Sequence, residues 1–336
     1  MAEDSITSAP GTRCQPVIWR TFLWHVFLLL NFVISCGAQL RNDFYAATCP
    51  RLAHAVRGNV AASLLHDPTA PAAFLRLFFH DCQVQGCDGS ILLDSQDGIV
   101  SEREAPSNLG IRRLEFIDAI KSSVEAICPG TVSCADIVVL AAREAVRIAG
   151  GPFIEVPLGR RDALTASAAR AQAELPPAHT GFDGFLQVFQ TKGLTLEESV
   201  ALLGSHTLGV GHCASVTNRL YPQRDQTLGP LFYSILRLRC PARTALRPKG
   251  GPIFPNDLTA LSFDSQYFRN AMAGRGLFRV DAEVARNPLT APIVNAFGTN
   301  TDAFFQAYST GFVKFSVHNV LSSPQQGIIR RDCRRL

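Results

Sequence analysis

The cysteines of this chain, read together with an apolar segment near its N-terminus, constrain its fold more than any other feature. An apolar run over 21–35 is preceded by arginines and followed by small residues at 36–38. This order is typical of a secretory signal peptide, so residues 1–38 are predicted to be removed. A membrane anchor is the alternative, but the run is short for a bilayer and contains His25 and Asn31.

Eight of the ten cysteines remain after this cleavage, because Cys14 and Cys36 lie in the leader. An even number of cysteines in an oxidising compartment indicates a disulfide framework. Eight cysteines allow about a hundred pairings, so spacing settles only the local pair of Cys82 and Cys87. The chain is expected to be secreted, to the extracellular space or cell wall.

Composition and charge exclude several classes of protein. A length of 336 residues with 47% hydrophobic content is enough for one large domain or two layers around a shared core. The formal charge of +4 suits an acidic environment. No basic run with interleaved aromatic residues is found, so no nucleic-acid partner is expected, and no membrane partner is expected after cleavage of the leader.

Apolar periodicity is helical almost throughout the mature chain, which predicts an all-α fold. Helices are expected over 51–66, from about Pro71 into His80, and from an N-cap at Ser133 to the glycines at 150–151. Another helix is expected to begin at a capping box formed by Thr195 and Glu198 and to carry His206 near its end. Long loops are expected over 94–110, 159–180 and 241–261.

Arg76 and His80 are four residues apart on the second expected helix and therefore share a face, with Phe79 beside them. A cation and a base are thus directed into one space. For a single histidine, a satisfied place in the core is the more common role. Arg76 favours a functional role, because a buried arginine without an anion is costly.

The loop after this helix is rich in oxygen ligands and glycines. Asp81, Asp88 and Ser90 offer hard oxygen ligands, while Gly86 and Gly89 let the backbone turn its carbonyl groups inward. Calcium is one interpretation, and an acidic surface turn that caps the next helix is the other. A further histidine, His206 in GSHTLG, cannot be coupled by spacing to a residue 126 positions earlier.

Several motifs together resemble one family, the class III, or secreted plant-type, haem peroxidases. In this chain, RLFFHDCQVQGCDGSILLD resembles the distal motif of the family, and ALLGSHTLG resembles its proximal motif. FYAATCP, CPGTVSCADIVVLAAR, VPLGRRD, FDSQYF and IIRRDC follow in family order and cover nearly all of residues 39–333. The resemblance implies one haem b held between two helical lobes, a distal lobe at about 39–180 and a proximal lobe at about 181–336.

The resemblance also implies a role for each matching residue. His206 resembles the axial ligand of the haem iron, with Asp281 accepting its other ring proton. His80 resembles the distal base and Arg76 the cation that stabilises charge as the O–O bond breaks. Asn108 resembles the acceptor that fixes His80. Phe79 is expected to border the haem, and Glu102 resembles the residue that ties Asn108 to a calcium shell.

Two calcium ions are implied by the same resemblance. The distal set is Asp81, Val84, Gly86, Asp88 and Ser90, joined by Glu102. The proximal set is Thr207, Asp257, Thr259 and Asp264. The family pattern has an aspartate where this chain has Asn256, so the loop is one residue shorter or the proximal site is weaker.

The family pairing of the cysteines would use all eight: Cys49 with Cys128, Cys82 with Cys87, Cys134 with Cys333, and Cys213 with Cys240. Asp136 and Arg160 resemble a buried structural ion pair. Pro176 matches the proline at the substrate entrance, but the residues after it depart from the family pattern. The tryptophan position of the family is Ile154 here, which excludes a surface tryptophan radical route.

The implied function is reduction of hydrogen peroxide and oxidation of small phenolic donors by successive one-electron steps, by a monomer. The few residues after Cys333 favour an extracellular over a vacuolar destination. Two other classes remain open: a binding module that keeps the fold without turnover, and a metal-dependent hydrolase that uses His80 and Asp81. The complete set of motif residues disfavours the first, and the lack of clustered metal ligands around His80 disfavours the second.

Overall fold

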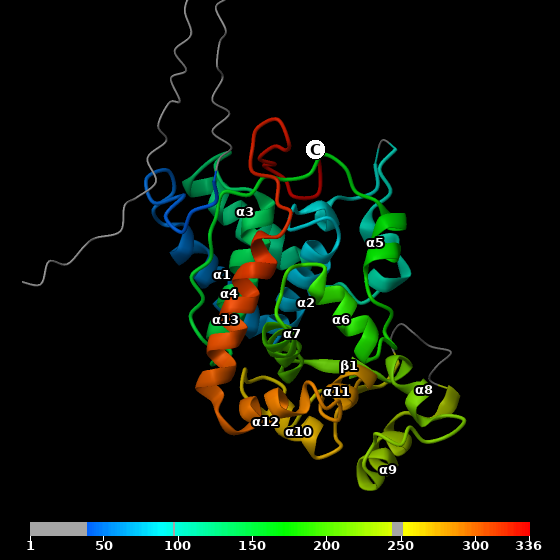
Figure 1. The fold of residues 1–336 in the computed structure, drawn as a ribbon. Coiled ribbons are helices and arrows are strands. Elements are labelled where there is room, and N and C mark those ends of the chain that lie inside the picture. The colour runs from blue at the N-terminus through cyan, green and yellow to red at the C-terminus, as the bar shows by residue number, and fades with distance from the viewer. Residues whose placement is uncertain (1–38, 97, 244–250) are drawn as a thin grey trace, which may run out of the picture. The chain divides into compact units, whose positions relative to one another are not determined.

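The structure, a computed structural model, describes residues 39–96, 98–243 and 251–336. The predicted signal peptide lies outside the described residues. Within the described part of the chain there are thirteen α-helices and one two-stranded sheet, which confirms the all-α prediction (Figure 1). None of the described helices has both the length and the apolar character needed to cross a bilayer.

The first helices surround a central one. They are α1 (Leu52–His66), α2 (Ala70–Gln83), α3 (Leu114–Ile127) and α4 (Cys134–Ile148). Every residue of α4 from Cys134 to Val146 is buried, because α1, α2 and α3 all pack around it. The side chain of Ser133 accepts a hydrogen bond from the backbone of Asp136, so the predicted N-cap is confirmed.

The second group of helices begins after a long connection. Its members are α5 (Ala168–Glu174), α6 (Phe182–Gln190), α7 (Leu196–Leu203), α8 (Thr217–Leu220), α9 (Pro230–Arg239), α10 (Gln266–Met272), α11 (Arg279–Val284), α12 (Ala291–Thr299) and α13 (Thr301–Val317). The long helix α13 packs on α7 and α12, and its Phe312 stacks on Phe78 of α2 at 4.4 Å. Aromatic rings therefore join the last helix to the second.

Two expectations about local structure need correction. The loops expected over 159–180 and 241–261 contain helix α5 and strand β2 (Ile253–Pro255), which pairs antiparallel with β1 (Val210–His212). The capping box of Thr195 and Glu198 is present, but α7 ends at Leu203. His206 lies instead in a following 3-10 turn, Gly204–Thr207, because the chain bends there towards β1.

Four disulfides connect the cysteines in the pairing that the resemblance implied: Cys49–Cys128, Cys82–Cys87, Cys134–Cys333 and Cys213–Cys240. The bond from Cys134 to Cys333 closes a loop of 199 residues, so it strongly limits the unfolded chain. Asp136 and Arg160 form the expected buried ion pair at 2.8 Å. Tyr45 also donates to Asp136, and Arg160 donates to the carbonyl of Ser316, so neither charge is left without partners.

Candidate active site

Helix α2 carries a cation and an imidazole on one face, as the spacing predicts. His80 is buried, with 7% of its surface exposed, whereas Arg76 remains exposed. The guanidinium of Arg76 lies against the backbone at Gly110, and it forms no ion pair with any described carboxylate. Desolvation of the guanidinium by the surrounding protein, and then the positive charge of Arg112, lower the pKa of Arg76. Its positive charge is therefore available to an incoming anion.

Asn108 fixes the proton on His80. Its Nδ2 donates to the backbone carbonyl of Glu102 at 2.8 Å, so its Oδ1 must face His80. That Oδ1 lies 2.5 Å from Nδ1 of His80. Because an amide oxygen can only accept, Nδ1 carries the hydrogen and Nε2 keeps its lone pair. The arrangement leaves a base at Nε2.

The surroundings of His80 keep it neutral. Burial, and then the positive charge of Arg76, lower its pKa to about 3, although the hydrogen bond to Asn108 acts in the opposite direction. A neutral imidazole can accept a proton over nearly the whole physiological pH range. The exposed cation and the neutral base together form a site that can take a proton from a small acid and bind the resulting anion.

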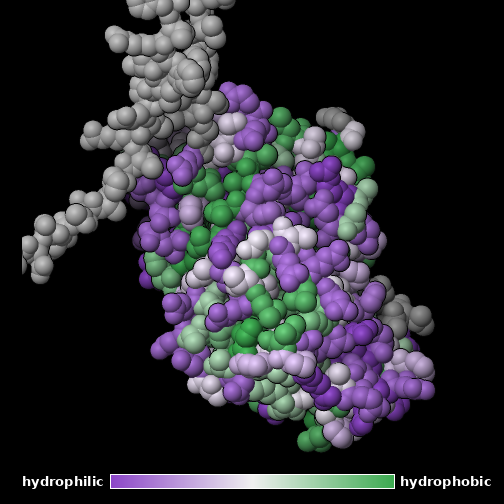
Figure 2. Space-filling view, in the orientation of Figure 1, coloured by the Kyte–Doolittle hydropathy of each residue, from purple (hydrophilic) through white to green (hydrophobic). Residues whose placement is uncertain are grey.

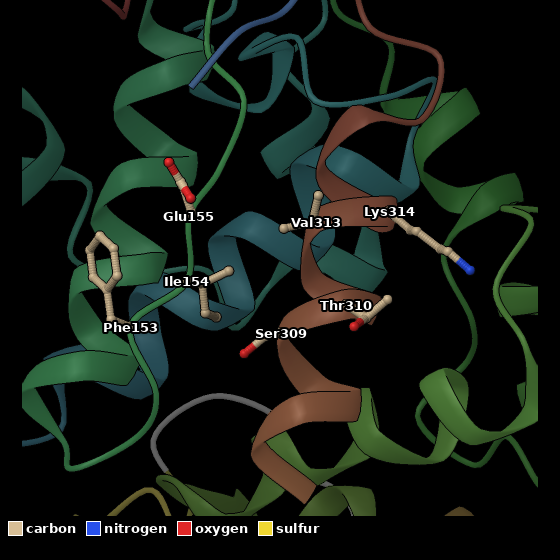
Figure 3. Close-up of a pocket in the computed structure, with 7 residues that line it drawn as sticks. All are labelled: Phe153, Ile154, Glu155, Ser309, Thr310, Val313 and Lys314. Atoms are coloured by element: carbon tan, nitrogen blue, oxygen red, sulfur yellow. The ribbon is translucent and has the colours of Figure 1, made fainter. Parts of the chain in front are cut away.

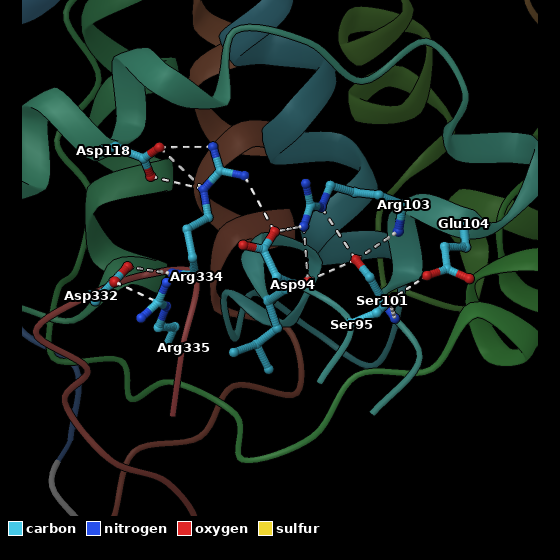
Figure 4. Close-up of polar contacts among 10 residues, drawn as sticks. Asp94, Ser95, Ser101, Arg103, Glu104, Asp118, Asp332, Arg334 and Arg335 are labelled. Atoms are coloured by element: carbon cyan, nitrogen blue, oxygen red, sulfur yellow. Dashed lines mark hydrogen bonds and ion pairs between the residues drawn. The ribbon is translucent and has the colours of Figure 1, made fainter. Parts of the chain in front are cut away.

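The segment that carries Glu102 and Asn108 is anchored by a network of polar side chains (Figure 4). Arg103 contacts Asp94 and donates to Ser101 and to the carbonyl of Leu93. Arg334 binds Asp118 of α3 at 2.7 Å and also reaches Asp94. The position of Asn108 therefore depends on contacts that extend to the end of the chain.

Three carboxyl groups are buried at the C-terminal end of α2 and in the segments that follow it. Asp81, Asp88 and Glu102 are at most 5% exposed, yet Oδ1 of Asp81 and both carboxylate oxygens of Glu102 have no hydrogen-bond partner. Burial raises the pKa of all three, to about 6 for Asp88 and to about 8 for Glu102. Neighbouring carboxylates add to this for Asp81. Orphaned, buried carboxylate oxygens fit a hard cation.

The backbone around these carboxyl groups requires glycine at one point. At Gly86 φ is +130°, and an added Cβ would lie 2.2 Å from the carbonyl oxygen of Asn319. The disulfide between Cys82 and Cys87 closes the same loop. Arg330 reaches into it from the C-terminal segment and donates to the carbonyl of Gly89 at 2.6 Å. No tight cluster of three His, Cys, Asp or Glu is found in the described chain, so carbonyl ligands would have to complete a metal site.

His206 is held by a carboxylate and an aromatic ring. Its Nδ1 lies 2.8 Å from Oδ1 of Asp281, which is buried. The ring of Phe278 meets the imidazole edge-on at 5.1 Å. The side chain of His206 is 34% exposed, and within the described chain its hydrogen bond uses Nδ1 alone. Nε2 is therefore free and accessible, as an axial ligand to haem iron must be.

Asp281 accepts three hydrogen bonds. Besides His206, it accepts from the hydroxyl of Tyr267 at 3.0 Å and from the backbone of Phe278 at 2.8 Å. Sequence reasoning missed both Tyr267 and Phe278. The signal for Phe278 was its place three residues before Asp281 at a helix start, where an acidic side chain accepts from the N-cap backbone. Tyr267 had no local signal beyond its place in FDSQYF.

The four residues of the proposed proximal calcium set meet around two carboxylates. Thr207 donates to Asp257 at 2.7 Å, and Thr259 lies 3.2 Å from both Asp257 and Asp264. Asn256 turns away and donates to the carbonyl of Leu208. Asp257, rather than Asn256, is therefore the acidic side chain that the two threonines contact.

Pro176, expected at the substrate entrance, is half-buried between α5 and α6, and the residues 177–179 after it are exposed. A surface hollow of about 340 Å³ lies elsewhere, between the segment at 153–155 and α13 (Figure 3). Its Lys314 is already paired with Glu198. None of the sequence-predicted site residues lines that hollow, so it does not mark the site.

Comparison with known proteins identifies the family of this chain. The family model described as Peroxidase matches residues 56–300. Peroxidase 29 of Arabidopsis thaliana is 43% identical over 91% of this chain and 94% of its own length. Peroxidase 72 of the same plant is 40% identical over 92% and 93%, respectively. The chain belongs to the peroxidase family, which uses haem and calcium, and it is a haem peroxidase that reduces hydrogen peroxide and oxidises donor molecules.

Proposed function

We propose that His206 and Asp281 hold the haem and that His80, Arg76 and Asn108 act on hydrogen peroxide at its other face. One observation carries the proposal: each histidine has its Nδ1 engaged by an oriented acceptor, which leaves both Nε2 atoms for chemistry. The difference between the acceptors assigns the roles. A neutral amide leaves His80 a weak, neutral base, whereas a carboxylate makes His206 a strongly donating ligand.

Haem, when bound, supplies the iron that coordinates peroxide and accepts electrons in single steps. The distal residues then handle the proton and the charge. Nε2 of His80 would take a proton from one oxygen of hydrogen peroxide and deliver it to the other oxygen, which would leave as water. The guanidinium of Arg76 stabilises the negative charge that develops as the O–O bond breaks. Phe79, half-buried beside His80, would border the haem.

Two calcium ions complete the proposal. The distal ion would bind the carboxylates of Asp81 and Asp88, the hydroxyl of Ser90 and the carbonyls of Val84 and Gly86, with Glu102 nearby. This binding would satisfy the orphaned oxygen of Asp81. The proximal ion would bind Thr207, Asp257, Thr259 and Asp264. Because both sets adjoin a haem-facing histidine in sequence, each ion would fix the position of one histidine.

Small phenolic donors are the proposed reducing substrates, and Pro176 is proposed to border their entrance. We further propose that the haem lies between a distal lobe at about 39–180 and a proximal lobe at about 181–336, in a monomer. Secretion to the cell wall or extracellular space is supported by the predicted signal peptide and by four disulfides, which persist in oxidising compartments.

Haem-reconstituted protein provides the test. Wild type and His80→Ala are expected to show a Soret band, and His206→Ala is expected to lose it or to shift it until imidazole is added. His80→Ala is expected to react with peroxide about a thousandfold more slowly, because it lacks the base. His54→Ala, which changes an exposed histidine of α1, serves as the control. Equal peroxide rates in wild type and His80→Ala would contradict the assignment.

A further inference from the structure

Helix α9 has apolar residues on both of its sides. Phe232 and Leu236 are buried and pack beside the disulfide of Cys240. On the other side, Leu231, Ile235 and Leu238 recur at helical spacing and are 75%, 45% and 88% exposed. Figure 2 shows hydrophobic side chains among hydrophilic ones at the end of the molecule where α9 lies. An exposed apolar stripe on a helix indicates a binding surface.

Arginines without acidic partners flank this stripe. Arg224 and Arg237 stack on tyrosine rings, Arg239 donates to a backbone carbonyl, and Arg243 is exposed. None of these four forms an ion pair with a described carboxylate. Residues 217–243 contain five arginines and one aspartate, a formal charge of +4, which equals that of the whole chain. The charges of the remaining residues sum to zero, so the segment that contains α9 is a positively charged part of the chain.

We propose that α9 docks peripherally on an anionic lipid bilayer. The arginines complement lipid phosphates, and the three apolar side chains insert between head groups. A second copy of this chain would bring like charges together, and a polyanionic sugar would leave the leucines in water. Such contact needs no spanning helix. The proposed docking departs from the sequence-based expectation of no membrane partner. That expectation considered spanning segments rather than exposed helix faces.

Sedimentation with lipid vesicles tests this surface. The mature protein is expected to bind vesicles of phosphatidylserine and phosphatidylcholine but not vesicles of phosphatidylcholine alone. L231N/L238N and R237Q/R239Q should each weaken binding at least tenfold, whereas F153N, which changes an exposed ring outside α9, should not. Absent binding, binding unaffected by L231N/L238N, or dimerisation through α9 would overturn the proposal.

A different observation concerns the proximal side, and it rests on the proposed function. Oδ1 of Asp281 accepts from both His206 and Tyr267, at 2.8 and 3.0 Å. Two donors at one oxygen compete for the same electron density, and the buried site strengthens both hydrogen bonds. The hydrogen bond from the Tyr267 hydroxyl therefore weakens the hydrogen bond that Asp281 accepts from His206.

We infer that Tyr267 is a positioning residue that limits how strongly His206 donates electrons to haem iron. Without its hydroxyl, the His206 hydrogen bond would shorten and the imidazole would become more anionic. A more anionic imidazole binds ferric iron more tightly. The ferric state would then be favoured over the ferrous state, and the bond between iron and His206 would stiffen.

The test compares two buried tyrosines in haem-reconstituted protein. Tyr267→Phe is expected to raise the iron–histidine stretching frequency and to shift the ferric/ferrous equilibrium about tenfold towards ferric, the value of one hydrogen bond to a charged group. Tyr308→Phe is the matched control, because Tyr308 is equally buried and loses a hydrogen bond to Ser205 rather than to Asp281.

The two possible failures are distinguishable. An iron–histidine band at the wild-type frequency in Tyr267→Phe, or an equal shift in Tyr308→Phe, would overturn the role of Tyr267. Absence of any iron–histidine band in the wild-type protein would instead overturn the assignment of His206 as the ligand.

Discussion

The two carboxylate-lined loops of this molecule differ in how the negative charge of their buried carboxylates is stabilised. In the distal loop, Asp81 and Glu102 are buried with oxygens that no donor reaches. In the proximal loop, the threonine hydroxyls of Thr207 and Thr259 donate to Asp257, so its charge is already shared. We therefore expect the distal loop to depend on the proposed calcium ion more than the proximal loop does.

Removal of calcium should expose this difference most strongly. Chelation is expected to destabilise the protein by about 4 kcal/mol relative to calcium at a thousandfold excess over its dissociation constant. Asp81→Asn should already lack most of this calcium-dependent stability, because it has little distal calcium affinity left to lose. Asp257→Asn should keep most of it. Thermal melting of both variants with and without calcium measures it. Equal calcium dependence in the two variants would remove the proposed asymmetry.

Asn108 links the distal loop to His80. Its replacement should therefore have a smaller effect than the removal of calcium. Asn108→Leu removes the acceptor of the His80 Nδ1 proton, so the proton can move to Nε2. The loss of the free Nε2 is expected to slow the reaction with peroxide by about 10- to 100-fold. Asn108→Asp keeps an acceptor and should lose less. Stopped-flow absorbance of the haem-loaded variants gives the rates. A wild-type rate in Asn108→Leu would separate the loop from catalysis.

The smallest expected effect is a pH dependence limited to the calcium-free protein. Folding raises the pKa of Glu102 to about 8 and that of Asp88 to about 6, both above their ordinary values. The folded state therefore holds more protons, and its stability should fall as pH rises from 7.5 to 8.5, by about 1 kcal/mol per pH unit for each proton lost.

His80 does not contribute in this window, because its pKa is about 3 in the folded state and about 6.5 when unfolded, so above pH 7.5 it is largely neutral in both states. Calcium should abolish the slope by holding the carboxylates ionised. Urea unfolding at several pH values, with and without calcium, checks the prediction. Calcium-free stability that is constant or increases between pH 7.5 and 8.5 would contradict it.

Local signals predicted the helices well. The caps at Ser133 and Thr195 follow from side chains within three residues, so they are readable in the sequence. The shared face of Arg76 and His80 follows from helical spacing alone. Ser167, whose side chain caps α5, was an unused signal of the same kind.

Long-range partners could not be predicted in this way. The contact between Tyr267 and Asp281, and that between Arg330 and Gly89, depend on how distant segments pack. The three-residue strands β1 and β2 are too short to show a period. The link between His80 and His206 came from family resemblance, and their geometric roles stay predictions until tested.

The C-terminal segment gives the distal half of the molecule a dependence on the order of synthesis. Arg330 completes the loop behind His80, Cys333 is bonded to Cys134, and Arg334 holds the segment that carries Asn108 through Asp94. These residues are synthesised long after the helices they brace. The distal half can therefore finish folding only after residues 330–334 have left the ribosome.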